Sequence, residues 1–148
     1  MQDELYLQPA EYRKDGFLLT SDPEKIDTDA VCALLWQTYW AQERPRAVIE
    51  RSLKHSLCFS LFDGEKQIGL IRILTDYATF AYLCDVVIAE PYRGQGLGKW
   101  ALGCVRSHPG LCALPRWCLL TRDAHTFYEQ FGFTPLKNPQ FYMEEIKP

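Results

Sequence analysis

The sequence has no excess of basic residues, because its 16 Lys and Arg are outnumbered by 19 Asp and Glu, giving a net charge of −3. Proteins that bind nucleic acid through its phosphates usually carry a basic surface, so no nucleic-acid partner is expected. The chain also has no apolar run near the ~20 residues that cross a bilayer. Its start at Met1–Glu4 lacks the basic and apolar regions of a signal peptide. These absences predict a cytoplasmic protein that binds no membrane.

The six cysteines form no C-x-x-C pair, so the usual spacing of a zinc site is absent and no metal is expected. Four of them lie within apolar stretches, where free thiols are commonly buried: Cys32, Cys58, Cys84 and Cys118. Together with the lack of an export signal, this usage fits a reducing cytosol rather than a set of disulfides. Linkers, low-complexity tracts and repeats are also absent. The 148 residues, 47% of them hydrophobic, suit one domain spanning residues 1–148.

Hydrophobic spacing divides the chain into strand and helix segments. Asp63-Gly64 is a tight-turn signal between two apolar strands, and the near-continuous apolar run over residues 80–88 is typical of a central strand. Asp27 or Thr28 is placed to cap a helix. We expect strands at 17–21, 57–62, 67–74, 80–88, 117–120 and 141–146, and helices at 28–39, 46–55, 97–107 and 124–131. This order predicts a mixed α/β (α+β) sheet.

The most informative stretch is the glycine-rich segment Pro91–Lys99, which follows the central strand and opens a helix. Glycines let the backbone turn tightly and approach a ligand, and the free N–H groups of a helix start attract an anion. A Walker A loop is excluded, because its first glycine would fall on Arg93 and its last position on Trp100. A dinucleotide fingerprint is disfavoured, because Lys99 stands where the third glycine belongs.

The segment does satisfy R-x-x-G-x-G with Arg93, Gly96 and Gly98. In its place between a strand and a helix, this motif resembles the pyrophosphate-binding motif of the GNAT superfamily, the acetyl-CoA-dependent N-acetyltransferases. The stretch from Tyr128 to Phe133 is similar to the family's Y-x-x-x-G-F, and residues 75–86 resemble one bacterial branch of the superfamily. The resemblance covers residues 17–146. It implies a mixed, mostly antiparallel sheet that is flanked by helices and splayed at the central strand.

The resemblance also implies which residues bind acetyl-CoA, the co-substrate that donates the acetyl group. The exposed backbone of Val86 and Ile88 would pair with pantetheine, and the Val86 N–H would stabilise the oxyanion that forms during attack. Tyr128 matches the tyrosine that protonates the departing thiolate, and packing in an aromatic face is its alternative role. The residues implied to hold the pyrophosphate are Arg93, Gly94, Gln95, Gly96, Leu97, Gly98 and Lys99.

A general base is less well defined, because Cys84 occupies the position where many family members have a glutamate. Asp85 is adjacent, but strand alternation directs it to the opposite face, which favours a structural role. His125 carries the side chain type that titrates near neutral pH, yet it follows Asp123, a candidate helix N-cap, so a structural role fits it equally well. Asp76 is a further candidate. A base acting through ordered water, or no dedicated base, also remains open.

The acceptor is expected to bind near the first two helices, where residues 39–44 carry aromatic side chains and both charge signs. Tyr39, Trp40 and Arg44 would form one wall of the pocket, with Arg72, Asp76, Arg122 and Asp123 beside it. The alternative for the Tyr39-Trp40 pair is a homodimer interface or a hydrophobic closure. The mixture of charges does not select between an acidic and a basic acceptor.

The function implied by the resemblance is transfer of an acetyl group from acetyl-CoA to a primary amine of a small molecule in a ternary complex. A protein N-terminus or lysine is an alternative acceptor. An acyl-CoA-binding sensor without turnover is an alternative function. The presence of both the R-x-x-G-x-G motif and Tyr128 favours the enzyme. Besides the small-molecule amine substrate, a homodimer partner is compatible with the sequence.

Overall fold

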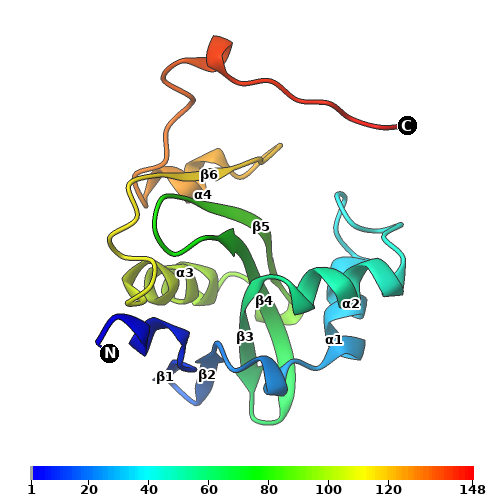
Figure 1. Ribbon diagram of the computed structural model, residues 1–148. Helices are drawn as coiled ribbons and strands as arrows, with labels where there is room; N and C mark the ends of the chain where they lie inside the picture. The colour runs from blue at the N-terminus through cyan, green and yellow to red at the C-terminus, as the bar shows by residue number, and fades with distance from the viewer. Residues whose placement is uncertain (1) are drawn as a thin grey trace.

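Six strands form one sheet in the order β1-β2-β3-β4-β5-β6 in the computed structural model, which describes residues 2–148 (Figure 1). Neighbours from β1 to β5 run antiparallel, and β5 and β6 run parallel. The strands are β1 (Glu11–Lys14), β2 (Phe17–Thr20), β3 (Leu57–Asp63), β4 (Lys66–Thr75), β5 (Ala81–Ile88) and β6 (Trp117–Leu119). The expected mixed, mostly antiparallel sheet is therefore confirmed.

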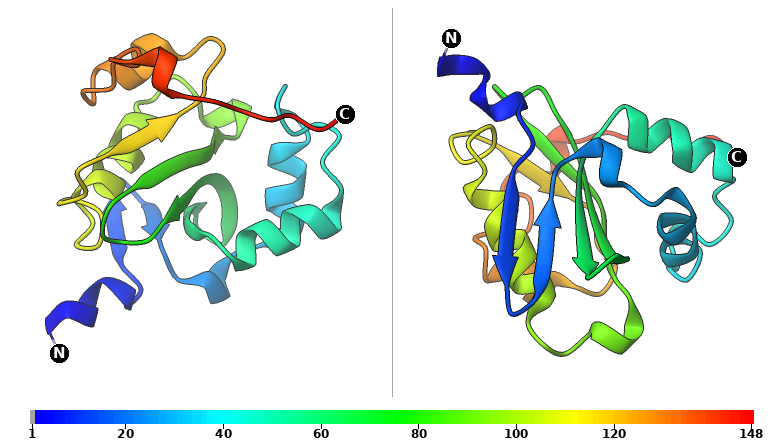
Figure 2. Two further views of the ribbon diagram at one scale, coloured as in Figure 1. Left: turned by 45° about the horizontal axis from the view of Figure 1, so that its top comes forward. Right: turned by 90° about the horizontal axis from the view of Figure 1, so that it is seen from below.

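Helices lie on both faces of this sheet, with α3 on one face and α1 and α2 on the other (Figure 2, right). The Asp27 carboxylate accepts the Ala30 N–H at 3.1 Å and caps α1, one of the two capping residues predicted. No helix among residues 2–148 is long and apolar enough to span a membrane. The α-helices are α1 (Thr28–Leu35), α2 (Arg46–Lys54), α3 (Leu97–Ser107) and α4 (His125–Glu129), and the short 3-10 helices are η1 (Gln2–Leu7), η2 (Pro23–Lys25), η3 (Glu90–Tyr92) and η4 (Pro139–Phe141).

Each face of the sheet has its own hydrophobic core. On one face Phe59 and Ile71 pack with Leu102 of α3. On the other face, Leu70 and Val87 pack against α1 and α2. All six cysteines are free thiols; Cys32 and Cys58 are buried as expected, whereas Cys84 and Cys118 are only partly buried.

A bulge in β5 changes which way its residues face. Arg72 of β4 lies opposite Asp85, but the next pair involves Leu83, so Cys84 has no partner on β4. Leu83 before the bulge and Val86 after it both pack in the core under α3. Asp85 is therefore turned toward the face covered by α1 and α2, where it meets the side chains described below.

Several predicted boundaries are wrong. The expected strand at 141–146 does not form, because the chain after η4 runs exposed and away from the sheet and has no strand beside it (Figure 1). Conversely, β1 forms where no strand was expected. Its residues are mostly polar, and pairing with β2 holds them in an edge strand. Helices α1 and α4 are shorter than the predicted ranges 28–39 and 124–131.

Gly69 lies where β4 packs most tightly against its neighbours. A Cβ atom at this position would lie 3.1 Å from the Val87 carbonyl oxygen and 3.2 Å from Leu61 Cβ. We predict that Gly69→Ala lowers the free energy of unfolding by about 1–3 kcal/mol, as overpacking usually does. In Gly103→Ala, the control in α3, the new Cβ meets nothing within 4 Å, so stability should rise by about 0.5–1 kcal/mol. Urea titrations that give both variants the same stability would contradict this packing.

Candidate active site

The pairing between β5 and β6 is short, and the sheet opens where it ends. β5 pairs with β6 only from Ala81 to Leu83, and β6 itself ends at Leu119. β5 continues to Ile88, so its last residues have no strand on the side away from β4 (Figure 1). The sheet therefore has a gap at the carboxyl end of its central strand.

The backbone groups of Val86 and Ile88 face this gap. The Ala89 N–H donates to the Ile68 carbonyl of β4 at 2.7 Å. Because successive amides of a strand point to opposite sides, the N–H groups of Ile88 and Val86 point away from β4. These are the two backbone positions to which the family resemblance assigns pantetheine and oxyanion binding.

A cleft of about 720 Å³ occupies the gap. It brings together four separate parts of the chain: β5, the segment after α1, the segment after β6, and α4. The lining residues are Gln37, Thr38, Tyr39, Trp40, Tyr82, Leu83, Cys84, Val86, Val87, Ile88, Arg93, Leu120, Thr121, Arg122, Asp123, Ala124 and Tyr128.

The glycine loop adjoins the cleft at the end of β5. Gly94 and Gly96 have φ angles of +79° and +80°, a left-handed conformation that favours glycine. At the start of α3 the Trp100 N–H donates to the Gly96 carbonyl, so the amides just before Trp100 precede the intrahelical bonds. No side chain of the described residues caps this helix start. Its free amides suit a phosphate, as the loop pattern predicts.

A smaller cleft of about 410 Å³ lies in front of this loop. It shares Val86, Ile88, Arg93 and Tyr128 with the larger cleft, so one ligand can extend from the glycine loop into the gap. The Arg93 Nε donates to the Ile88 carbonyl oxygen at 2.8 Å. This hydrogen bond connects the start of the glycine loop to the end of β5, whether or not Arg93 also contacts a phosphate.

Tyr128 stands where the two clefts meet. It lies on α4 with its ring half-buried, and the rings of Phe127 and Phe133 lie 5.1 and 5.9 Å away, centre to centre. Burial raises the pKa of the Tyr128 phenol to about 12, and nearby Tyr39 contributes to this increase. The phenol therefore keeps its proton at neutral pH and is available to donate it.

Asp85 lies beneath the cleft, fully buried, and is bound by three side chains. Arg72 Nε donates to its carboxylate at 2.6 Å, Trp40 Nε1 donates at 2.7 Å, and one Arg44 nitrogen reaches both oxygens at 3.2 and 3.3 Å. This cluster ties the segment after α1 to β4 and β5. Because both oxygens already accept hydrogen bonds, the geometry gives Asp85 a structural role and leaves no oxygen for a base.

The residues predicted to form one wall of the acceptor pocket lie in two different places. Tyr39 and Trp40 line the cleft, whereas Arg44 and Arg72 lie behind it with Asp85. The Tyr39 hydroxyl accepts the Arg122 N–H at 3.1 Å, and the Arg122 guanidinium lies 3.8 Å from the centre of the Tyr39 ring. These contacts bridge the acceptor end of the cleft, from the segment after α1 to the segment after β6.

Two other candidate residues lie outside the cleft. Asp76 is exposed in the turn between β4 and β5, at the far end from the glycine loop, and its carboxylate accepts the N–H groups of residues 78–80. Its hydrogen bonds, above all that from the Thr79 hydroxyl, hold the pKa of Asp76 below its usual range. His125 lines a separate groove on the other side of α4. The predicted cap Asp123 does not cap α4, because the N-cap position is Ala124 and no side chain of the described residues accepts a hydrogen bond from the first turn.

Cys84 does line the cleft, at the position of the family's glutamate. Burial raises the pKa of its thiol, so the group is protonated at neutral pH and is a poor base. Among residues 2–148 no group of three or more His, Cys, Asp or Glu is placed to hold a metal ion. Backbone amides and the Tyr128 hydroxyl supply hydrogen-bond donors at the gap, and Arg122 and Asp123 add charged groups to the lining of the cleft.

A mostly antiparallel sheet that opens beside a glycine loop at a helix start defines the acyl-CoA-dependent acetyltransferase class. The family model "Acetyltransferase (GNAT) domain" matches residues 54–135. The chain belongs to this GNAT acetyltransferase family, and the resemblance seen in the sequence is confirmed.

Two known proteins are similar to this chain in sequence, and a third is similar in fold. A protein of Gibberella zeae, provisionally named an acetyltransferase, is 30% identical over 84% of this chain and 83% of its own. A GNAT-family crystal structure from Xanthomonas campestris is 40% identical, with a TM-score of 0.85 over 89% of this chain and 94% of its own. A GNAT acetyltransferase from Elizabethkingia anophelis, crystallised with acetyl-CoA, is 16% identical with a TM-score of 0.65 over 91% and 90% of the two chains, and so supports the fold alone.

Replacement of Asp85 should show how much the buried cluster contributes to the free energy of unfolding. Asp85→Asn removes the charge that two arginines share, and we predict that the free energy of unfolding falls by about 3 kcal/mol or more, as for other broken buried pairs. Asp123→Asn is the control, because the Asp123 side chain is 61% exposed and its pairing with Arg122 contributes little. Urea unfolding curves measure both. A loss for Asp85→Asn no larger than that for the control would contradict the structural role.

Proposed function

We propose that this chain transfers the acetyl group of acetyl-CoA to the primary amine of a small molecule, by direct attack of the amine in a ternary complex. The observation that carries the proposal is the opening between β5 and β6. It joins a phosphate-suited glycine loop to an aromatic-lined cleft, with a protonated tyrosine where the two clefts meet.

At the coenzyme end, the backbone of this chain would make most of the contacts. The loop amides of residues 94–99 would bind the pyrophosphate, helped by the positive end of α3 and the charge of Lys99. Val86 and Ile88 would pair with the amide groups of pantetheine as a neighbouring strand would. The free side of β5 supports this reading, because it presents N–H groups that the sheet does not use.

At the reacting end, two donors are available. The Val86 N–H would donate to the carbonyl oxygen as it gains negative charge during attack. The amine nitrogen forms the new bond to the carbonyl carbon, the carbon–sulfur bond breaks, and the Tyr128 hydroxyl would pass its proton to the departing sulfur. Burial of Tyr128 supports this role, because it keeps the phenol in its protonated form up to high pH.

None of the predicted base candidates is placed to remove the amine proton at neutral pH, and Asp123, which lines the cleft, pairs with Arg122 at 3.4 Å. Cys84 is held as a thiol, Asp85 is occupied by its three partners, and His125 lies in a different groove. We therefore infer that the acceptor loses its protons to water in the open cleft. Activity should then rise with pH as the free-amine fraction of the acceptor rises.

The contact between Tyr39 and Arg122 favours a small molecule over a protein as acceptor. A peptide needs a groove open at both ends, whereas these residues join the two sides of the cleft at its acceptor end. The test is release of free thiol from acetyl-CoA with a panel of small primary amines and a matched set of peptides with free N-termini or lysines. Turnover with peptides alone would instead support a protein acetyltransferase, and binding of acetyl-CoA without turnover would support a sensor.

Tyr128→Phe should separate catalysis from binding. The variant keeps the ring but loses the proton donor, so we predict that kcat falls about 10²-fold or more while the Kd for acetyl-CoA stays within a factor of about 3. Tyr142→Phe is the control, because Tyr142 lies outside both clefts, and it should keep full activity. Kinetics with the best amine of the panel and a binding titration measure the two effects. Full turnover in Tyr128→Phe would remove Tyr128 from the mechanism.

A further inference from the structure

The larger cleft carries two adjacent side chains of opposite charge at its acceptor end. Of the described residues that line this cleft, only Arg93, Arg122 and Asp123 are charged. Arg93 also lines the smaller cleft in front of the glycine loop, so it belongs to the coenzyme end. Arg122 and Asp123, here called the charged pair, lie between β6 and α4 and line the larger cleft alone. One positive and one negative group therefore face the acceptor.

The Arg122 guanidinium is held against Tyr39. Its central carbon lies 3.8 Å from the centre of the Tyr39 ring, close enough for cation–π attraction. The Arg122 backbone N–H also donates to the Tyr39 hydroxyl, at 3.1 Å. The Arg122 side chain is nevertheless 65% exposed. A guanidinium held in this way still offers the N–H groups along its edge, whose geometry matches the two oxygens of a carboxylate.

The two members of the charged pair bind each other only weakly. One Arg122 nitrogen lies 3.4 Å from one Asp123 oxygen, and both side chains are more than half exposed. Exposed ion pairs of this kind contribute little to stability. Among residues 2–148 no other side chain donates a hydrogen bond to the Asp123 carboxylate. Each charge is therefore free to bind an opposite charge on a ligand.

The charged pair lies close to the reacting end of the cleft. Besides burial, the Tyr39 phenol contributes to the raised pKa of Tyr128, so these two side chains lie near each other. Trp40 lines the same cleft, and its ring lies 5.1 Å from the Tyr39 ring, centre to centre. A ligand with a charged head group on the pair would need only a short apolar chain, packed on these rings, to bring a second group to Tyr128.

We propose that the acceptor is a basic amino acid, whose α-carboxylate binds Arg122, whose α-ammonium binds Asp123, and whose side-chain amine is acetylated. This inference rests on the proposed function and names its substrate class. A zwitterionic head group matches two adjacent opposite charges, whereas a diamine would leave Arg122 without a partner and an ω-amino acid would leave Asp123 without one. The side-chain nitrogen bonds to the acetyl carbon, coenzyme A leaves as its thiol, and one amine proton passes to water.

A comparison of substrates tests the head group. L-Lysine and L-ornithine are compared with analogues that lack only the carboxylate (cadaverine and putrescine) or only the α-amine (ε-aminocaproate and δ-aminovalerate), with thiol release from acetyl-CoA as the readout. We expect kcat/KM for the better amino acid to exceed that of both its analogues about 10-fold or more, because each analogue lacks one charged hydrogen bond. Mass spectrometry of the product should place the acetyl group on the side-chain nitrogen.

The outcomes separate this inference from the proposed function. Equal kcat/KM for an amino acid and its analogues, or acetylation of the α-amine, would overturn the inference and leave acetyl transfer to small amines in place. If no amine of the set released thiol, the proposed function would itself be contradicted, and the inference with it.

Two variants then assign the two halves of the head group. Arg122→Gln should lower kcat/KM for the amino acid about 10-fold or more, and should leave that for the diamine within a factor of about 3. Asp123→Asn should lower kcat/KM for the amino acid in the same way and spare the ω-amino acid. An equal loss for every amine in either variant would show that the residue does not read the head group, and would overturn the proposal.

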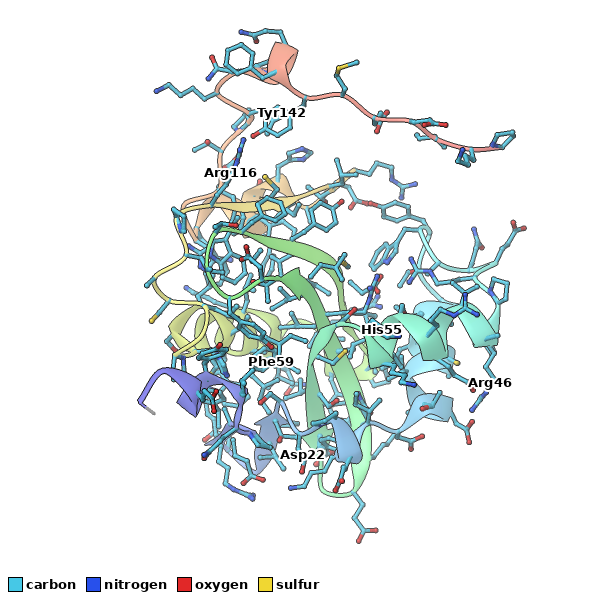
Figure 3. The ribbon with its side chains drawn as sticks, in the orientation of Figure 1. Asp22, Arg46, His55, Phe59, Arg116 and Tyr142 are labelled. Carbon is cyan, nitrogen blue, oxygen red and sulfur yellow. The ribbon has the colours of Figure 1, made fainter. Side chains whose placement is uncertain are left out.

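Arg116→Gln is the matched control for these variants. Arg116 also lies against a tyrosine ring, with its guanidinium 5.1 Å from the centre of the Tyr142 ring, and Figure 3 shows the two side chains close together. Neither Arg116 nor Tyr142 lines either cleft. This variant should therefore keep the wild-type kcat/KM for every amine, and a loss of amino-acid preference in it would contradict a specific role for Arg122.

Discussion

The constraint on which this molecule depends is the early end of the pairing between β5 and β6. If the pairing continued past Leu83, the N–H groups of Val86 and Ile88 would be bonded within the sheet and no cleft would separate the strands. The bulge at Cys84 falls at the same point, and bulges bend a strand and increase its twist. The glycine loop follows directly on β5, so one length of backbone presents unpaired N–H donors both at the gap and at the start of α3.

Side chains on the opposite face of β5 keep the walls of this opening in place. The buried Asp85 carboxylate is shared by Arg44, Arg72 and Trp40, which come from the segment after α1 and from β4. Strand alternation turns Asp85 and Val86 to opposite faces, and the bulge determines which face each takes, since Leu83 and Val86 both pack under α3. Two functions are thereby separated in adjacent residues: Val86 offers its backbone to the cleft, and Asp85 uses its side chain to hold the cleft wall.

The sequence was most informative where local rules dominate. Glycines with left-handed φ angles made the loop from Gly94 to Gly96 recognisable, and helical periodicity gave the bounds of α3 correctly. The sequence contained no comparable pattern for contacts between residues far apart in the chain. The partners of Asp85 are 13 to 45 residues away in the chain. The apolar pattern at 141–146 predicted a strand, but in the structure this segment lies exposed and pairs with no strand of the described residues.

Hydrogen exchange at the end of β5 tests the central claim most directly. The amides of Val86 and Ile88 should exchange quickly in the free protein, because the opened sheet leaves them without a strand partner, whereas that of Ala89, bonded to Ile68, should exchange slowly. Saturating acetyl-CoA should slow exchange at Val86, Ile88 and residues 94–99, and NAD should not. Slow exchange at Val86 and Ile88 in the free protein, or no change with acetyl-CoA, would contradict the account of the gap as the acetyl-CoA site.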